Sequence, residues 1–461
     1  MLIPALVMGE KKYSLDRKLL LNYCGEKMAD VCHIPGIAVS KYISDQRRAY
    51  VDSPVEELLN IIKKAGEILT SEIIDGESFD EYILKLSGST GLPTKTSKSG
   101  LENLALCMRN INVILDREMQ QYCISGLDTG MVRDRWGKLA ISPYGRMLGV
   151  IAPSNHPSVH ISWITALAMK YSVVIKAGRD DPFTPYRVIQ ALLKAGLNNV
   201  LVSMIPTEQE SIPKIIDGCD RVIFYGSQKT ISCYNSEKII SRGSGNSKIY
   251  FDIENAELND AMLDIAVKSV MYDGGRRCTN ASSIVIKGDA EKFSKKLAEK
   301  LFWELDNPIN EDSDIGCFKS FKEADQLNRF IEENLGGDRD ISGEVNGRIR
   351  LQRVGGTTYL NPTVILCDSD KSALYGKELP FPFVTVMKAG NQIVKHLSNS
   401  LAVTLINAKQ EIIDACLKEP SISKVILNNP TYSSRMGDPH DGFLFNHLYR
   451  VKSFVEEGEL C

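Results

Sequence analysis

Cys278 is the residue of this sequence best placed for covalent chemistry. It lies in the segment 271–285, MYDGGRRCTNASSIV, directly after two glycines and the pair Arg276 and Arg277. Glycines allow a backbone and a substrate carbonyl to approach the sulfur closely. A nearby guanidinium, or a backbone N–H aimed at the sulfur, favours the thiolate, which is the form that attacks carbonyl carbons. Taken alone, the pattern fits a buried cysteine before a strand even better, because free cysteine so often belongs to a core. The rest of the chain must therefore show whether Cys278 is a nucleophile or a buried core residue.

Composition indicates a globular protein of two to four structural units. The chain has 461 residues, 43% of them hydrophobic and 25% charged, with a net charge of −3. The absence of a basic excess disfavours nucleic acid and membrane surfaces as partners. Eleven cysteines without a CxxC pair indicate reduced thiols rather than disulfides or a zinc site. Leu2–Met8 is too short and lacks the flanks of a signal peptide, and no apolar stretch approaches the ~20 residues of a membrane span. We expect a soluble cytoplasmic protein.

The first third of the chain reads mainly as helices. An edge strand is possible near Leu2–Val7, and the apolar residues of 54–120 recur with a helical period. Within that region, 87–100 (SGSTGLPTKTSKSG) predicts a turn-rich connector. Residues 121–144 predict a strand pair that projects from the body.

From Arg146 onward, strands alternate with helices. This alternation predicts an α/β fold with a doubly wound parallel sheet, followed after Gly245 by a second α/β unit. The glycine-rich segment Gly336–Gly356 predicts a surface hairpin or loop. The expected strands are Met147–Ala152, Ser172–Lys176, Val200–Ile205, Arg221–Tyr225, Thr363–Leu366, Phe383–Val386 and Leu401–Leu405, and the later helices are Asn259–Met271 and Lys292–Leu305.

The order of short motifs along this part resembles the aldehyde dehydrogenase superfamily. Each motif alone is weak, but six occur in the family's order between Arg146 and Asn429. They are Gly149–Asn155 (GVIAPSN), Ser172–Lys176 with Pro182, Val222–Ser227 (VIFYGS), Gly274–Cys278 (GGRRC), Tyr359–Val364 (YLNPTV) and Glu378 with Pro382. The resemblance implies a Rossmann-type cofactor domain, a second α/β catalytic domain and a β oligomerisation arm.

The resemblance also implies catalytic roles. Cys278 would attack an aldehyde or acyl carbon, forming a hemithioacetal or a thioester. The Asn155 side-chain amide and the Cys278 backbone N–H would stabilise the oxyanion. Asn155 also fits a helix N-cap after a strand, and both roles can hold together.

Cofactor contacts follow from the same resemblance. Lys176 would bind the adenosine ribose, Glu378 the nicotinamide ribose, and Gly226-Ser227 would present a helix N-terminus to the pyrophosphate. Lys176 alone would otherwise be a surface charge at a strand end. Members that use NAD usually carry glutamate three residues after this lysine, whereas this chain has Arg179. An arginine suits a 2′-phosphate, so NADPH is expected, with NAD possible, although Asp180 or Asp181 can pair with Arg179.

A second departure concerns the hydrolytic base. Hydrolytic members carry a glutamate about 35 residues before the cysteine. Counted back from Ala256-Glu257-Leu258, which is similar to the family's A-D-L, that position falls on Gly243. Gly243–Asn246 is instead similar to the G-x-G-N of members that acylate coenzyme A. Without a carboxylate base the thioester exchanges with a thiol rather than with water, unless Asp252 or Glu254 replaces the missing glutamate.

Late motifs narrow the resemblance further. Asp181–Thr184 (DPFT) and Arg435–Gly442 (RMGDPHDG) resemble the long-chain acyl reductases of bacterial bioluminescence, although Arg276, Arg277 and the Pro-Ser-Asn turn differ from that pattern. His440 is either a proton donor near the active site or, more simply, a structural imidazole. The remaining pair, His156 and His160, has helical spacing but no acidic partner motif that would make it a zinc site.

The sequence thus predicts NADPH-dependent reduction of a fatty acyl-CoA to an aldehyde through acyl-Cys278. The alternative is a hydrolytic NAD(P)-dependent aldehyde dehydrogenase; an acyl-phosphate reductase and an inactive scaffold are less favoured. Partners would be the acyl thioester, coenzyme A, further copies of this chain and an acyl-transferring enzyme. We expect residues 1–120 and 145–245 to form the dinucleotide-binding domain, 246–429 the catalytic domain, and 121–144 with 430–461 the oligomerisation arm.

Overall fold

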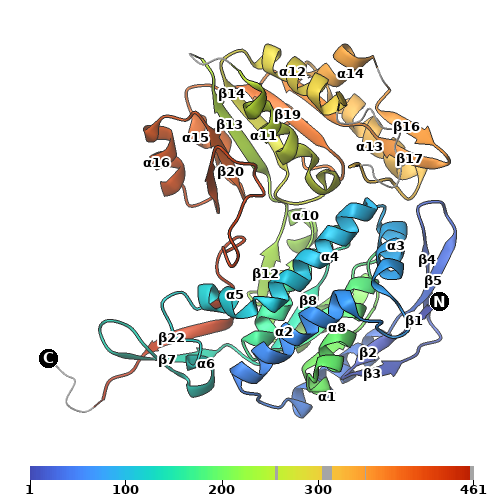
Figure 1. Cartoon of the computed structure of the whole chain (residues 1–461), viewed down its shortest axis with the longest axis vertical. Helices are drawn as coiled ribbons and strands as arrows, with labels where there is room; N and C mark the ends of the chain where they lie inside the picture. The colour runs from blue at the N-terminus through green and yellow to red at the C-terminus, as the bar shows by residue number, and fades with distance from the viewer. Residues whose placement is uncertain (255–257, 304–313, 348, 457–461) are drawn as a thin grey trace.

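The structure is a computed structural model that describes residues 1–254, 258–303, 314–347 and 349–456. Two α/β lobes lie one above the other, and a three-stranded arm extends from the lower one (Figure 1). The motif Ala256-Glu257, from which the position of Gly243 was counted, lies outside the described residues, as does the end of the helix expected over Lys292–Leu305.

A seven-stranded sheet forms the centre of the first lobe. Its order is β12-β11-β8-β9-β10-β2-β3, and the five strands from β12 to β10 are parallel. These strands are buried on both faces, as expected for continuous apolar runs in a parallel sheet. The strands are β2 (Ala5–Val7), β3 (Glu10–Lys12), β8 (Met147–Ile151), β9 (Ser172–Lys176), β10 (Val202–Met204), β11 (Arg221–Tyr225) and β12 (Ile239–Arg242).

Helices cover both faces of this sheet. On one face α1 (Gly36–Ala49) and α9 (Ile212–Gly218) pack on Met147 and Ile151. On the other face, Leu148 and Val150 join a core with three further helices, because successive strand residues point to opposite faces. Those helices are α2 (Val55–Ser71), α7 (Ile161–Ala168) and α8 (Phe183–Ala195). The predicted doubly wound α/β arrangement is confirmed.

The second lobe has its own seven-stranded sheet, in the order β15-β18-β19-β14-β13-β20-β21. All its pairs are parallel except β15 with β18. The strands are β13 (Ser247–Asp252), β14 (Ala281–Lys287), β15 (Arg339–Asp340), β18 (Thr363–Cys367), β19 (Phe383–Lys388), β20 (Val403–Ile406) and β21 (Val425–Leu427). The helices are α11 (Asp260–Met271), α12 (Ala290–Trp303), α13 (Phe321–Asn334), α14 (Ile341–Asn346), α15 (Ile393–Leu397) and α16 (Gln410–Lys418). The surface segment predicted at Gly336–Gly356 contains α14 and ends in the hairpin of β16 (Leu351–Val354) and β17 (Thr357–Leu360).

The connector predicted at 87–100 is wrong. Two helices, α3 (Phe79–Thr90) and α4 (Thr94–Arg109), leave only three residues between them. Gly91 ends α3 in the left-handed conformation and Pro93 precedes α4. The polar start of α4 stays buried because Ser97 Oγ lies 2.9 Å from Ser87 Oγ in a hydrogen bond. The helix continues as α5 (Ile111–Glu118) after a break at Asn110.

The projecting strand pair is present and has a third member. Strands β6 (Met131–Arg133) and β7 (Lys138–Pro143) pair, and β22 (Tyr449–Ser453) adds antiparallel to the other edge of β7 (Figure 1). Residues near Leu2–Val7 do not form one edge strand. They divide into β1 (Leu2–Ile3), in a small sheet with β4 (Arg17–Leu21) and β5 (Lys27–Cys32), and β2, which has β10 and β3 on its two sides. Three further short helices are α6 (Gly126–Thr129), α10 (Gln228–Ile231) and α17 (Phe445–Leu448). Across the described residues, no helix combines the length and the apolarity that a bilayer span requires.

Candidate active site

The order of the first sheet locates a crevice at its carboxyl edge. Strands β9 and β10 lie on one side of β8, while β11 and β12 lie on the other. Ligands of open α/β sheets bind outside the strand carboxyl ends where the order reverses in this way. Lys176 is the last residue of β9, Asn155 follows β8 by four residues, and Gly226-Ser227 follows β11. The structure therefore brings these predicted residues to one edge.

Cys278 lies on the second lobe, between α11 and β14. The chain before it makes a tight turn in which Asp273, Gly274 and Gly275 all have positive φ values of 52°, 71° and 72°. A Cβ at Gly275 would lie 2.5 Å from the Pro382 nitrogen, so only glycine fits there. This catalytic loop, residues 272–280, thus has a conformation set by close backbone contacts.

The two arginines before Cys278 have different partners. Arg276 donates to three carbonyl oxygens, those of Thr90 (2.8 Å), Cys317 (2.7 Å) and Pro380 (3.2 Å). Arg277 donates to Asp273 at 3.0 Å. Arg276 therefore anchors the catalytic loop to both lobes, and the charge of Arg277 is shared with a carboxylate.

The Cys278 thiol is protonated at neutral pH. Burial, and then the negative charge of Glu378, raise the pKa of Cys278 to about 11, although Arg277 and the backbone N–H groups of Cys278 and Thr279 act in the opposite direction. Arg277 and the backbone N–H groups thus favour the thiolate, as expected, but burial and Glu378 outweigh them. Such a thiol needs a proton acceptor before it can attack a carbonyl carbon.

His440 is the nearest such acceptor. Its Nε2 lies 3.2 Å from Cys278 Sγ, across 162 positions of sequence. Surrounding protein atoms, and then the cations Arg242, Lys424 and Arg277, lower the pKa of His440. The imidazole is therefore neutral at neutral pH, while its side chain keeps 49% of its surface exposed. The structure thus places His440 beside Cys278, which is the position considered for a proton donor.

A loop between β21 and α17 holds His440 in place. Asp438 accepts a hydrogen bond from Arg117 of α5 at 2.7 Å, and Asp441 forms an ion pair with Arg242 at the end of β12. Arg242 is 8% exposed. The motif residues on either side of His440 thus tie the loop to the first lobe. Nothing in the spacing of the sequence identified Arg242 as the partner of Asp441.

Asn155 lies against the catalytic loop. Its Nδ2 donates to the Arg276 carbonyl at 3.1 Å, and its Oδ1 is buried with no hydrogen-bond partner among the described residues. The amide carries two hydrogens, so one is free of that bond. The N-cap alternative for Asn155 is wrong, because His156 caps the short helix Pro157–His160 by accepting from Ser158 N.

The Gly243–Asn246 segment packs directly on Cys278. A Cβ at Gly245 would lie 1.8 Å from the Cys278 carbonyl oxygen, whereas one at Gly243 would have its nearest neighbour at 3.4 Å. Glu378 Oε2 accepts from Gly245 N at 2.8 Å and from Asn246 N at 3.2 Å. Burial nevertheless raises the pKa of Glu378 to about 7. Glu378 therefore joins the thiol site.

The other proposed bases lie far from the thiol. Asp252 and Glu254 lie 3.6 Å and 2.9 Å from the Lys287 ammonium. Asp252 is five residues along β13 from Ser247, whose Oγ donates to the Cys278 carbonyl at 2.9 Å. Five strand residues span ~16 Å, so Asp252 does not take the place of a base at position 243.

Lys176 has the surroundings of a binding residue. Burial lowers the pKa of its ammonium, while Glu208 raises it. The described residues provide it with no hydrogen bond or ion pair. A desolvated cation of this kind fits a polar ligand such as a ribose, so the residues present at this edge fit a dinucleotide.

Arg179 and Gly226-Ser227 are less clearly arranged for a cofactor. The Arg179 guanidinium is 85% exposed and donates to Asp180 at 3.3 Å, and Asp180 also pairs with Lys319. Ser227 Oγ accepts from Thr230 N and so caps α10, which has only four residues. The expected helix N-terminus is therefore one short turn.

His156 and His160 have partners other than a metal ion. His156 Nε2 lies 3.1 Å from Asp273, and His160 Nδ1 accepts from Trp163 Nε1 at 2.9 Å. Burial lowers the pKa of His160 to about 3. Across the residues that the structure describes, no group of three metal-ligating side chains is found.

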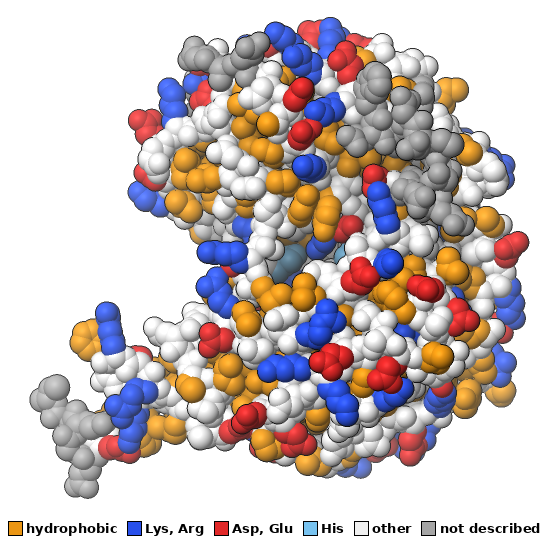
Figure 2. Space-filling view, in the orientation of Figure 1, with side chains coloured by type: hydrophobic (Ala, Val, Ile, Leu, Met, Phe, Trp, Pro, Cys, Tyr) orange, Lys and Arg blue, Asp and Glu red, His pale blue; other side chains and the backbone are white. Residues whose placement is uncertain are grey.

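The space around the site is seen in the surface view. Figure 2 shows a hollow between the two lobes, with histidine atoms visible on its floor. A cavity of about 380 Å³ adjoins the catalytic loop at Tyr272 and Asp273, with α4 and α11 as its other walls. Tyr272 stacks on Tyr432 there, with 3.8 Å between ring centres.

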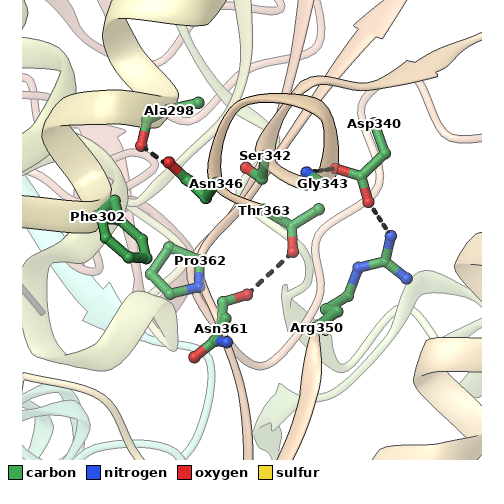
Figure 3. Close-up of a pocket in the computed structure, with 10 residues that line it drawn as sticks. All are labelled: Ala298, Phe302, Asp340, Ser342, Gly343, Asn346, Arg350, Asn361, Pro362 and Thr363. Carbon is green, nitrogen blue, oxygen red and sulfur yellow. Dashed lines mark hydrogen bonds and ion pairs between the residues drawn. The ribbon is translucent and has the colours of Figure 1, made fainter. Parts of the chain in front are cut away.

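A second, much smaller cavity lies away from Cys278. It is enclosed by α12, α14 and the start of β18, and Arg350 pairs with Asp340 at its edge (Figure 3). Its volume of about 20 Å³ corresponds to one water molecule. This cavity has no room for a substrate.

Comparisons with known proteins identify the family of this chain. Residues 28–443 match the aldehyde dehydrogenase family. A mitochondrial aldehyde dehydrogenase of Leishmania tarentolae is 24% identical over 314 residues, which cover 63% of this chain and 61% of that protein. A malonate-semialdehyde dehydrogenase of Lacticaseibacillus casei is 22% identical over 400 residues, covering 83% and 73%. The match to the human cytosolic 10-formyltetrahydrofolate dehydrogenase, at 26% identity, spans 27% of that longer protein.

Solved structures share the fold. The aldehyde dehydrogenase KauB from Pseudomonas aeruginosa superposes with a TM-score of 0.80 at 17% identity, covering 98% of this chain and 95% of that one. An NAD+ complex of an aldehyde dehydrogenase from Bacillus cereus gives 0.80 at 17% identity, covering 98% and 96%. Together with the family match over most of its length, the two lobes and the cysteine loop show that this chain belongs to the aldehyde dehydrogenase family.

Proposed function

We propose that this chain interconverts an acyl thioester and an aldehyde through a thioester on Cys278, with NADPH as the preferred cofactor. A fatty acyl-CoA is the substrate class favoured by the late sequence motifs. The relatives named above are dehydrogenases of other aldehydes, so the acylating subtype rests on the site of this chain.

The observation that carries the proposal is the surroundings of Gly243. Hydrolytic members place a glutamate at the corresponding position, whereas here the three atoms nearest to a Cβ at Gly243 belong to Gln228, Gly226 and Ser241, none of them a carboxylate. Asp252 and Glu254 pair with Lys287 at the far end of β13. Without an activated water, the acyl group on Cys278 persists until a thiol or a hydride removes it.

The side chains divide the work as follows. Cys278 attacks the carbonyl carbon, and the free Asn155 amide hydrogen and the Cys278 backbone N–H stabilise the oxyanion. The substrate enters through the hollow between the lobes or through the cavity at Tyr272. Lys176 and the carboxyl edge of the first sheet hold the dinucleotide, and the nicotinamide supplies or accepts the hydride. Glu378 stays available to the nicotinamide ribose through the carboxylate oxygen that accepts no backbone N–H.

The preference for NADPH rests on Arg179. Its exposed pairing with Asp180 contributes only ~0–1 kcal/mol, so a 2′-phosphate can displace the carboxylate. A bidentate phosphate contact is stronger than that pairing. The NAD+ complex of the Bacillus cereus structure shows which dinucleotide that protein binds; this chain has arginine three residues after Lys176.

A second candidate function is a hydrolytic aldehyde dehydrogenase. Glu378 favours it, because the pKa of this carboxyl is raised to about 7 and its charge acts on Cys278. A carboxylate of that pKa is suited to general-base work at neutral pH. Against it, Glu378 Oε2 already accepts two backbone N–H groups.

A burst experiment separates the two functions. Enzyme, a long-chain aldehyde and NADP+ are mixed without coenzyme A, and NADPH is followed spectrophotometrically. We expect one equivalent of NADPH per active site followed by little turnover, and continued acyl-CoA formation when coenzyme A is added. Cys278→Ser should give neither phase. Sustained formation of free acid without a thiol would refute the acylating function and establish the hydrolytic one.

A further inference from the structure

The contact between Cys278 and His440 joins the catalytic loop to the late segment of the chain. His440 Nε2 and Cys278 Sγ are 3.2 Å apart, within hydrogen-bond distance for a sulfur donor. The thiol carries its proton at neutral pH and the imidazole does not. A protonated thiol and a neutral imidazole at this separation form a donor and an acceptor.

We propose that His440 is the catalytic base of this site: it takes the proton of the Cys278 thiol and returns it to the departing thiol of the substrate. This assignment rests on the proposed function for the identity of the substrate. The proton transfer itself is a property of the Cys278 and His440 pair.

The groups around Cys278 other than His440 are poorly suited to accept the proton of its thiol. Arg276 and Arg277 are cations and accept no proton, and their charges are engaged with three carbonyls and with Asp273. Glu378 contacts the Gly245 and Asn246 amides. The other groups that hydrogen-bond to the Cys278 sulfur are the backbone N–H groups of Cys278 and Thr279, which donate and accept no proton.

The tautomer of His440 fits this role. For Nε2 to accept from sulfur, the ring hydrogen must be on Nδ1. His440 Nδ1 lies 3.6 Å from Asp441 Oδ1, and a carboxylate beside Nδ1 favours the hydrogen there. Asp441 is itself fixed by the buried Arg242. Asp441 is therefore a positioning residue: it orients the ring without touching the sulfur.

The exchange step balances without a redox partner. The bond from Cys278 Sγ to the acyl carbon forms as the thiol proton moves to His440 Nε2. The tetrahedral intermediate then collapses, the bond from the acyl carbon to the substrate sulfur breaks, and the departing thiolate takes the proton from His440. One thioester and one thiol are consumed, and one of each is formed.

The charges that face His440 set the pH range of this chemistry. Arg242 from β12, Lys424 beside β21 and Arg277 from the catalytic loop disfavour a second positive charge, and Asp441 on its own loop opposes them. Together with the surrounding protein atoms, these cations lower the pKa of His440 and favour its neutral, proton-accepting form. We expect the rate of acyl exchange to lose little between pH 8 and pH 6.

Two measurements test the proposal without a nicotinamide cofactor. The first is the pH dependence of iodoacetamide alkylation at Cys278, followed by mass spectrometry of the peptide that contains it, because other cysteines such as Cys24 and Cys233 are exposed. The second is exchange of radiolabelled coenzyme A into acyl-CoA. His440→Gln keeps a polar side chain of similar size, and His447→Gln is the matched control on α17, exposed and outside the site.

We expect His440→Gln to slow both rates by about 10²-fold or more at pH 7, within the range that a general base supplies. Its alkylation should rise steeply with pH up to the titration of an isolated buried thiol. Because the His440 side chain is half exposed, added imidazole should restore part of the exchange rate of His440→Ala. Asp441→Asn should lower the rates less and keep the wild-type shape of the pH profile. His447→Gln should behave as wild type.

Unchanged alkylation and exchange in His440→Gln would overturn the proposal, as would a loss in that variant equal at every pH with no rescue of His440→Ala by imidazole. The experiments distinguish a failure of the proposed function from a failure of the proton transfer. Absence of acyl exchange in the wild type refutes the proposed function, while the alkylation profile still tests the proton transfer.

Discussion

Replacing Gly245 by alanine should displace the catalytic cysteine. The Cβ of alanine would lie 1.8 Å from the Cys278 carbonyl oxygen and 2.6 Å from its carbon, whereas an ordinary contact begins at 3.4 Å. The neighbour is backbone and has no flexible end that can rotate away. One of the two segments must therefore shift by more than an ångström.

The size of the effect follows from that shift. Overpacking of a tight site typically costs ~1–3 kcal/mol, and misplacing a reacting group by ~1 Å lowers the rate by roughly 10²-fold. We therefore expect Gly245→Ala to lower kcat/KM about 10²-fold and to reduce the midpoint of thermal unfolding. NADPH consumption with an acyl-CoA reports the first quantity, and differential scanning calorimetry reports the second.

Gly243→Ala is the matched control, two residues away in the same segment. Its Cβ meets Gln228 Oε1 at 3.4 Å, an ordinary contact with the end of a side chain. We expect its activity and midpoint to stay within a factor of three and one degree or so of wild type, a surface-type substitution being worth about 0.5 kcal/mol or less. Wild-type kcat/KM and stability in Gly245→Ala would refute the packing of this segment on Cys278.

Three further predictions concern the carboxylate, the cofactor and the arm. Because the pKa of Glu378 is raised to about 7, the folded state binds its proton more tightly than the unfolded chain, so stability falls as pH rises from about 4.5 to about 7. Glu378→Gln should be more stable than wild type at pH 8, by up to about 3 kcal/mol, and equal to it near pH 4.5; denaturant titrations at the two pH values decide this. Arg179→Glu should abolish a preference for NADPH of roughly ten- to hundred-fold in KM, and a lower wild-type KM for NADH than for NADPH would contradict the role of Arg179. The chain should form a homo-oligomer through the arm, since among the described residues β22 pairs with β7 alone and leaves its outer edge, with the exposed Val451, open to a partner; a monomer in sedimentation experiments at micromolar concentration would exclude this.

The strands of the first sheet were predictable because their short apolar runs strongly favour a buried strand over other conformations. Ser172–Lys176 and Arg221–Tyr225 are short β-branched runs between turn residues, and the structure gives these same bounds. The start of α4 was not predictable in this way. Its residues TKTSKSG are polar and small, and they are helical because Ser97 and Gly100 pack against α3 and the Pro157 turn.

The chemistry of the site was predictable in part. The motif order identified Cys278 and Asn155, and the fold brings both to the junction of the lobes. The position of the Arg276 guanidinium could not be predicted from the local sequence, because three carbonyl oxygens of distant segments determine where it points. His440 was recognised only as one of two alternatives, because a contact across 162 positions leaves no periodicity in the sequence.

The three carbonyls around Arg276 also determine how the site opens. Thr90 ends a helix of the first lobe, while Cys317 and Pro380 belong to the second. Cys317 N in turn donates to the Gly91 carbonyl at 2.8 Å. A local opening of the catalytic loop must break the hydrogen bonds of Arg276 to both lobes at once. The loop therefore belongs to a cooperative unit that spans the two lobes. The amide of Cys317 should therefore exchange its hydrogen for deuterium only when the lobes separate, and its exchange rate gives a direct measure of how often the thiol is uncovered.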